Sequence, residues 1–304
     1  MRLSELTPAI VLLHVFSGML GCVIGSFLNV VVWRVPRGES LVTPPSHCPN
    51  CGHEIRPWEN IPVISWLCLR GKCSGCHQPI SIRYPLGELA TGLVYVIVCY
   101  AAWRRNLPVM VLPGYFFVLG TLVCVTQIDI KHRIIPNLIC YSGMTVAFLL
   151  ALLFPSGRLI FGTDYDSTSS GTLILRMVVS LFESSGVDIR STPLMFAALD
   201  CLLGLACGLV LLGIFAIPGF ILSTRIWQGR KTLMGMGDMK FLGMLGAFFG
   251  ADACVYILCA ASVAGFIYGV GKKVVRRGHD DSSVVFGPFL SVAAFLWMIF
   301  GKVW

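Results

Sequence analysis

Two aspartates lie at the ends of apolar segments, where a charged side chain needs an explanation. Asp129 follows the apolar run 109–128, and Asp238, within Gly235-Met236-Gly237-Asp238-Met239-Lys240, lies three residues before the run 241–250. In both places a lysine follows two residues later. A carboxylate inside a membrane-spanning helix costs roughly 3 kcal/mol on insertion scales, so such residues are rare and commonly functional. The two aspartates are therefore the first candidates for chemistry.

Two carboxylates that share one proton can hydrolyse an amide bond. The ionised carboxylate takes a proton from water, and the protonated one donates to the carbonyl oxygen. Gly235 and Gly237 lack a Cβ atom, so the backbone before Asp238 can approach another chain closely and adopt a positive φ. The alternative is that each aspartate only caps a helix or pairs with the neighbouring lysine.

Four of the 13 cysteines form two C-x-x-C pairs, Cys48 with Cys51 and Cys73 with Cys76. Four thiolates at this spacing are typical of a closed, tetrahedral zinc site, which is structural because it leaves no open position for catalysis. The alternative is disulfides or free thiols, but disulfides rarely persist in a cytoplasmic loop. We predict a structural zinc ion.

The composition predicts an all-α polytopic membrane protein. Of 304 residues, 56% are hydrophobic and 12% are charged, whereas a soluble domain carries about 25% charged residues. The net charge of +8 fits basic loops on the cytoplasmic side of a lipid bilayer, and we expect no nucleic-acid partner. Apolar runs of this length predict about eight transmembrane helices, over 10–33, 86–102, 109–128, 138–154, 195–223, 239–250, 253–270 and 284–300.

Three regions follow from this pattern. Residues 1–34 form the first transmembrane helix, which we expect to be uncleaved because basic residues, not a small-residue cleavage site, follow it. Residues 35–84 form a small cytoplasmic zinc-binding module, and residues 85–304 form a membrane-embedded core with an external insertion at 155–193. The basic residues place the module and both aspartates on the cytoplasmic side.

Several motifs together resemble one family, the type IV prepilin leader peptidases, which are bifunctional N-methyltransferases of the bacterial inner membrane. They are the stretch Gly25-Ser26-Phe27-Leu28-Asn29 leading to Arg34-Val35-Pro36, the two cysteine pairs, Asn60-Ile61-Pro62 with Ser65-Trp66, Arg83-Tyr84-Pro85, Asp129 with Ile135-Pro136-Asn137, the Asp238 motif, and Phe286-Gly287-Pro288-Phe289-Leu290.

The resemblance implies a GxGD-type aspartic protease in which Asp129 and Asp238 match the two catalytic aspartates. The implied substrates are type IV prepilins or the pseudopilins of type II secretion, cut after a Gly that ends a short basic leader at the cytoplasmic face. The new N-terminal residue, often Phe, is then methylated from S-adenosylmethionine. Polar residues of the family motifs near the module are candidates for binding this donor: Asn29, Arg34, Asn60 and Glu88.

Other functions remain open at this stage. A peptidase without methylation would keep both aspartates. A proton-coupled transporter with a zinc regulatory module would also use membrane carboxylates, although transporter sites lie near the midplane between repeats, and we find no repeat around the aspartates. A non-enzymatic membrane scaffold leaves the two aspartates unexplained. Glu88 has a structural alternative too, as a paired acid at the membrane interface.

Overall fold

The computed structural model describes residues 8–107, 109–154, 180, 193–225, 235–275 and 285–301. The described residues are mostly helical, and the β structure among them is limited to two isolated bridges, His47 with Glu54 and Lys72 with Pro79. They divide into two compact units, residues 1–124 and 125–304. The predicted external insertion at 155–193 lies almost entirely outside the described residues.

Each segment predicted to cross the membrane contains an α-helix of the structure. Five segments of the described residues are long and apolar enough to span a bilayer. One joins α1 to the short helix η2 (Val35–Arg37), and another joins the short helix η4 (Val109–Val111) to α4, while α5 and α11 are shorter apolar helices. The prediction of a helical membrane protein is therefore confirmed. Five candidate spans are found among the described residues, and the count of eight stays a prediction. The helices are α1 (Pro8–Arg34), α3 (Arg83–Arg104), α4 (Leu112–His132), α5 (Asn137–Leu153), α8 (Pro193–Arg225), α9 (Met236–Phe249), α10 (Ala251–Val275) and α11 (Gly287–Phe300).

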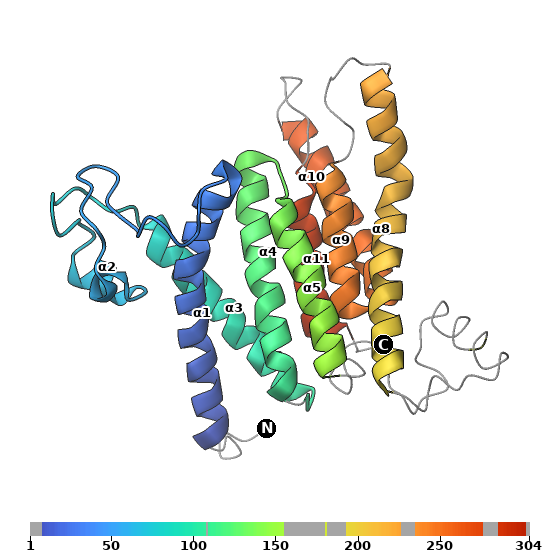
Figure 1. Cartoon of the computed structure of the whole chain (residues 1–304), viewed down its shortest axis with the longest axis horizontal. Helices are drawn as coiled ribbons and strands as arrows, with labels where there is room; N and C mark the ends of the chain where they lie inside the picture. The colour runs from blue at the N-terminus through green and yellow to red at the C-terminus, as the bar shows by residue number, and fades with distance from the viewer. Residues whose placement is uncertain are drawn as a thin grey trace. The chain divides into compact units, whose positions relative to one another are not determined.

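In the first unit, α1 and α3 lie side by side (Figure 1). Small residues allow the two backbones to approach closely: a Cβ atom at Gly21 would lie 2.8 Å from Gly92 Cα, the packing typical of membrane helices. Tyr95 of α3 is fully buried, and its hydroxyl donates to the Phe116 carbonyl of α4 at 2.7 Å. These contacts hold α3 against α1 and the start of α4.

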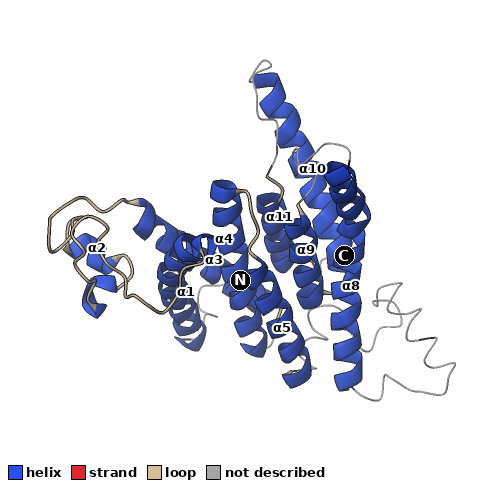
Figure 2. Ribbon diagram, turned by 45° about the horizontal axis from the view of Figure 1, so that its top comes forward, coloured by secondary structure: helices blue, strands red, loops and turns tan. Residues whose placement is uncertain are grey.

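The segment between α1 and α3 forms a small module that contains η3 (Pro57–Asn60) and α2 (Ile64–Cys68). Figure 2 shows it as mostly loop. Trp66 Nε1 donates to the Ile80 carbonyl at 3.1 Å, which closes the module on itself. Glu88, buried in the second turn of α3, accepts a hydrogen bond from the Val63 backbone N–H at 2.8 Å. This bond fastens the module to α3.

In the second unit, α9 is the central helix. It packs against α5, α8, α10 and α11, and every residue from 241 to 249 is buried. A helix that is apolar all round belongs in a core. At 14 residues it is about 21 Å long, which is shorter than the roughly 30 Å hydrocarbon layer. The predicted span at 239–250 is thus a protein-covered helix.

Glycines bring α8 and α9 into backbone contact. A Cβ atom at Gly208 would lie 2.5 Å from the Leu242 carbonyl oxygen, and one at Gly204 would overlap the Gly246 carbonyl oxygen. After α9, Gly250 adopts a φ of 86° and α10 begins at the next residue. The tight packing fixes α9 along its length and so fixes the position of its first turn, which carries Asp238.

Candidate active site and metal centre

Asp129 lies in the last turn of α4 and is 5% exposed. Its Oδ2 atom accepts a hydrogen bond from the backbone N–H of Gly287 at 3.0 Å. Gly287 is the first residue of α11, and the N-terminus of a helix carries a partial positive charge that favours an anion. The Asp129 carboxylate is therefore held between the end of one helix and the start of another.

Asp238 lies in the first turn of α9 and is half-buried. The expectation of positive φ at Gly235 or Gly237 is wrong, because the described glycines with positive φ are Gly38, Gly52, Gly71 and Gly250. The glycines are needed for space. A Cβ atom at Gly237 would lie 2.9 Å from Ile135 Cβ, and one at Gly235 would lie 3.4 Å from Asp238 Oδ2. Close packing against Ile135, not unusual backbone, explains Gly237.

Ile135 connects the two aspartate motifs. It lies against Gly237 on one side, and its Cδ1 atom would lie 3.4 Å from a Cβ atom at Gly287 on the other. Asp238 lies within electrostatic range of Asp129. The turn between α4 and α5, the start of α9 and the start of α11 therefore surround one acidic site.

A second contact ties α9 to α5 beside this site. Lys240 Nζ donates to Asn137 Oδ1 at 2.8 Å. The sequence motifs predicted the two aspartates, whereas the roles of Gly287 and Ile135 were missed. The signal for Gly287 was present, since a Gly-Pro pair opens the last apolar segment, but its partner lies 158 residues away.

The four cysteines of the C-x-x-C pairs form a cluster that could hold a metal ion. Their Sγ atoms all lie within 4.8 Å of one another, with 3.8 Å between Cys48 and Cys76 and 3.9 Å between Cys51 and Cys73. Four sulfurs at the zinc–sulfur bond length around a tetrahedral ion lie about 3.8 Å apart. The cluster fits that geometry.

The two C-x-x-C pairs have the same backbone shape. The N–H of Gly52 donates to the Cys48 carbonyl at 2.9 Å, and the N–H of His77 donates to the Cys73 carbonyl at 3.0 Å. Both donors follow the second cysteine of their pair and have positive φ, 71° at Gly52 and 58° at His77. A backbone N–H bond from Gln78 lowers the pKa of Cys76 to about 6, which favours the thiolate form that binds metals.

Because the two C-x-x-C pairs share one backbone shape, with glycine at position 52 and histidine at position 77, we predict that His77→Gly strengthens metal retention. A non-glycine residue with positive φ costs about 1–2 kcal/mol, which glycine avoids. We expect a bound metal ion to leave the variant about two- to tenfold more slowly in a chelator competition assay, because the folded module is stabilised. Gly52→Ala is the matched control and should change retention in the opposite direction. Equal retention in both variants would contradict the backbone argument.

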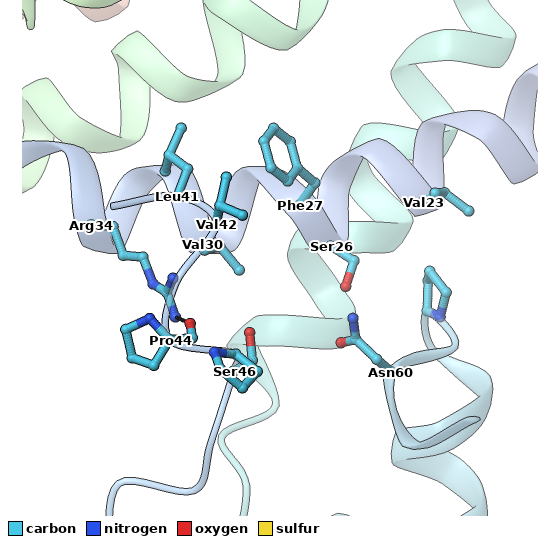
Figure 3. Close-up of a pocket in the computed structure, with 12 residues that line it drawn as sticks. Val23, Ser26, Phe27, Val30, Arg34, Leu41, Val42, Pro44, Ser46 and Asn60 are labelled. Atoms are coloured by element: carbon cyan, nitrogen blue, oxygen red, sulfur yellow. Dashed lines mark hydrogen bonds between the residues drawn. The ribbon is translucent and has the colours of Figure 1, made fainter. Parts of the chain in front are cut away.

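The first unit also contains a pocket of about 310 Å³ between α1 and the module. Figure 3 shows Arg34 at one end of it and Ser26 and Asn60 at the other. Of the four candidate donor-binding residues, Arg34 and Asn60 line this pocket, whereas Asn29 lies against Gly87 and Glu88 binds Val63. The other lining residues are mostly apolar. The complete lining comprises Val23, Ser26, Phe27, Val30, Arg34, Leu41, Val42, Pro44, Pro45, Ser46, Asn60 and Pro62.

Comparison with known proteins identifies relatives along most of the chain. Residues 19–105 match the bacterial peptidase A24 N-terminal domain, and residues 116–270 match the type IV leader peptidase family. A protein of Myxococcus xanthus is 34% identical over 85% of this chain, and the match spans 63% of that relative. Proteins of Pseudomonas aeruginosa and Stutzerimonas stutzeri are 32% and 31% identical over 93% of this chain and 89% of their own length.

All three relatives are named prepilin leader peptidase/N-methyltransferase. No solved structure matches the chain significantly. The second family model covers 155 of the 304 residues, from 116 to 270. With relatives above 30% identity aligned along most of its length, this chain belongs to the type IV leader peptidase family.

Proposed function

We propose that this protein removes the leader from type IV prepilins or type II secretion pseudopilins and then N-methylates the new N-terminal residue. The observation that carries the proposal is the buried Asp129 within electrostatic range of Asp238, with Gly237 and Gly287 both packed on Ile135. The relatives' name, prepilin leader peptidase/N-methyltransferase, supports both activities. Cleavage follows the Gly that ends the leader.

Asp129 and Asp238 act as the general acid and base of cleavage. The ionised carboxylate removes a proton from a water molecule as the water oxygen attacks the carbonyl carbon, and the protonated carboxyl donates its proton to the carbonyl oxygen. The tetrahedral intermediate then collapses and the C–N bond breaks. The leaving amine takes the proton from the protonated carboxyl, and the other carboxylate takes one from a hydroxyl of the intermediate, which restores the shared proton. The Gly287 N–H holds Asp129 Oδ2 in place. Close like charges favour one shared proton.

The membrane arrangement forms a further part of the proposal. The chain crosses a bacterial inner membrane eight times, with α5, α9 and α11 covered in part by the longer helices of their unit. Both aspartates and the cysteine module lie on the cytoplasmic side, because basic residues gather in the segments beside them. This side gives access to a short basic leader. The insertion at 155–193 then lies on the opposite, external side.

Zinc is the metal we propose for the cysteine cluster. Four thiolates close the coordination sphere, so the ion stabilises the module and takes no part in the reaction. A segment of this size has too little apolar core to fold without such support. S-adenosylmethionine, when bound, supplies the methyl group. The described residues that fit this donor lie in the first unit, with the cysteine module.

A single assay tests the two activities together. Purified protein is incubated with a prepilin whose mature N-terminal residue is Phe, with and without S-adenosylmethionine, and the products are identified by mass spectrometry. We expect leader removal in both reactions and a mass increase of one methyl group only with the donor. A prepilin with a bulky residue in place of the Gly before the cleavage site is the control and should stay intact. Cleavage without methylation would mean that the protein is a peptidase but not a methyltransferase.

Loss of zinc should impair methylation more than cleavage. Metal analysis of the wild type should give about one zinc per chain. Cys73→Ser removes one ligand, so we expect loss of the zinc and at least a tenfold lower methylation rate, because the module unfolds without metal. The aspartates belong to the other unit, so cleavage should fall by only about two- to threefold.

Cys68→Ser is the control, because Cys68 is an exposed cysteine outside the cluster. It should keep the zinc and both activities. Equal loss of cleavage and methylation in Cys73→Ser would contradict this prediction. It would show that the module also positions the leader for cleavage.

A further inference from the structure

The pocket in the first unit has polar groups that find no partner in the protein. Both Ser26, which is half-buried, and Asn60, which is exposed, line the pocket, and among the described residues neither side chain makes a hydrogen bond. Figure 3 shows them facing one another, Ser26 from α1 and Asn60 from the module. Phe27 and Val30 also line the pocket, and Figure 3 shows them along α1 between this end and Arg34. A ligand here would meet hydrogen-bonding groups at one end and apolar walls in the middle.

Arg34 supplies a positive charge at the other end. It is 8% exposed, and its guanidinium donates to the backbone carbonyls of Ser40 at 2.9 Å and Pro44 at 2.8 Å. No carboxylate among the described residues pairs with it. A buried cation without a counter-charge is costly, and its remaining N–H donors suit a carboxylate. The pocket thus favours a ligand with an anionic end.

Strained backbone directly follows one wall of the pocket and is held by a buried acid. Val63 adopts a φ of 60°, which is unfavourable for a β-branched residue and marks a functional constraint when it persists. Its N–H donates to Glu88 Oε2, and Glu88 is 7% exposed. Val63 directly follows Pro62, which lines the pocket with Asn60. Glu88 is therefore a positioning residue for this wall.

We propose that this pocket binds S-adenosylmethionine, with the donor's carboxylate toward Arg34 and its nucleoside toward Ser26 and Asn60. This inference rests on the proposed function, which requires a methyl donor. The ligand has the required features: an amino-acid carboxylate, a planar apolar base that can lie on Phe27, and ribose hydroxyls. The volume of about 310 Å³ is within the range of small-molecule sites.

Binding of S-adenosylhomocysteine to the full chain tests the assignment without relying on turnover. The dissociation constant is measured by isothermal titration calorimetry in detergent and in nanodiscs. Ser26→Leu, Phe27→Ala and Arg34→Gln should each weaken binding at least about tenfold, because each removes a polar bond, a stacking surface or the counter-charge. Zinc content and the rate of leader cleavage should stay within about twofold of the wild type.

Two control variants lie on the same helix or next to it but outside the pocket. Phe16→Ala removes an exposed aromatic ring of α1, and Arg37→Gln removes an arginine that stacks on Trp33. Neither should change the affinity. Glu88→Leu should weaken binding, and Glu88→Gln, which keeps an acceptor for the Val63 N–H, should restore most of it. This rescue would separate a positioning role from a general loss of folding.

The outcomes distinguish this site from the wider proposal. Unchanged affinity in both Ser26→Leu and Phe27→Ala would overturn the site, even if the wild type methylates a prepilin. Wild-type binding with the expected variant profile, but no methylated product, would keep the site and overturn the methyltransferase activity. If the variants change only the amount of anionic lipid that copurifies, the pocket is a lipid site and the proposal fails. Photolabelling with tritiated S-adenosylmethionine should modify peptides within residues 23–34 or 41–62.

Discussion

Replacing Asp129 or Asp238 by asparagine should abolish leader cleavage, with a rate at least about 1,000-fold below the wild type. General acid and base catalysis contributes about 10²–10⁴-fold, and asparagine can neither take a proton from water nor supply one. The side chain keeps its size, and its amide oxygen can still accept the hydrogen bond that Asp129 receives from Gly287. The protein should therefore stay folded, as judged by its zinc content and its elution from a sizing column.

Asp252→Asn is the matched control for the aspartate variants. Asp252 also lies in the first turn of a membrane helix, α10, but its side chain is exposed. The Asp252→Asn variant should cleave a prepilin at the wild-type rate. Both aspartate variants should still methylate a pilin supplied without its leader, because the proposed donor pocket is in the other unit. Cleavage above about one tenth of the wild-type rate in both variants would rule out the two-carboxylate mechanism.

Gly287→Ala should reduce cleavage about 100-fold with little effect on folding. An added Cβ atom would overlap Asp129 Oδ2 and lie 3.2 Å from its Cγ atom and 3.4 Å from Ile135 Cδ1. Either the carboxylate turns away or α11 shifts, and misplacing a catalytic group by about 1 Å can cost roughly 100-fold in rate. The overpacking itself costs about 1–3 kcal/mol. The measurement is the initial rate of prepilin cleavage beside thermal unfolding in detergent.

Gly265→Ala is the control for this substitution. It adds the same methyl group to a glycine of α10, where the nearest atoms, in Phe286 and Phe289, would lie 3.8 Å away. This is ordinary contact, so cleavage should be unchanged and the helix slightly more stable. If Gly287→Ala cleaves as fast as Gly265→Ala, the hydrogen bond from Gly287 does not position Asp129 for catalysis.

Local patterns in the sequence were sufficient to predict the protein class and the four-cysteine cluster. Long apolar runs require helices in a bilayer, because every backbone polar group must be satisfied within the segment. The two C-x-x-C pairs predicted a four-cysteine cluster because the ligands of each pair are set by neighbouring backbone. The turn from Asp129 to α5 was also readable, since Pro136 disfavours a continuous helix, and α5 begins at Asn137.

The tertiary structure was needed to tell which apolar helices are enclosed by protein. The run at 239–250 has the composition of a span, yet α9 is a short helix enclosed by α5, α8, α10 and α11. Hydrophobicity gives the same signal for a lipid-facing helix and for a buried one, so composition could not distinguish them. The sequence also could not show why residue 237 is a glycine. In the structure, Ile135 occupies the space that a side chain at this position would need.

The sequence by itself determined that this is a helical membrane protein with a four-cysteine cluster and two acidic motifs. Only the tertiary structure decided which distant residues meet at those motifs: Gly287 at Asp129, 158 residues away, and Asn137 at Lys240, 103 residues away. It also decided which polar residues of the first unit share a pocket, Arg34 and Asn60. The physical reason is that residue spacing specifies contacts within one turn or helix, whereas contacts between helices depend on how whole surfaces pack.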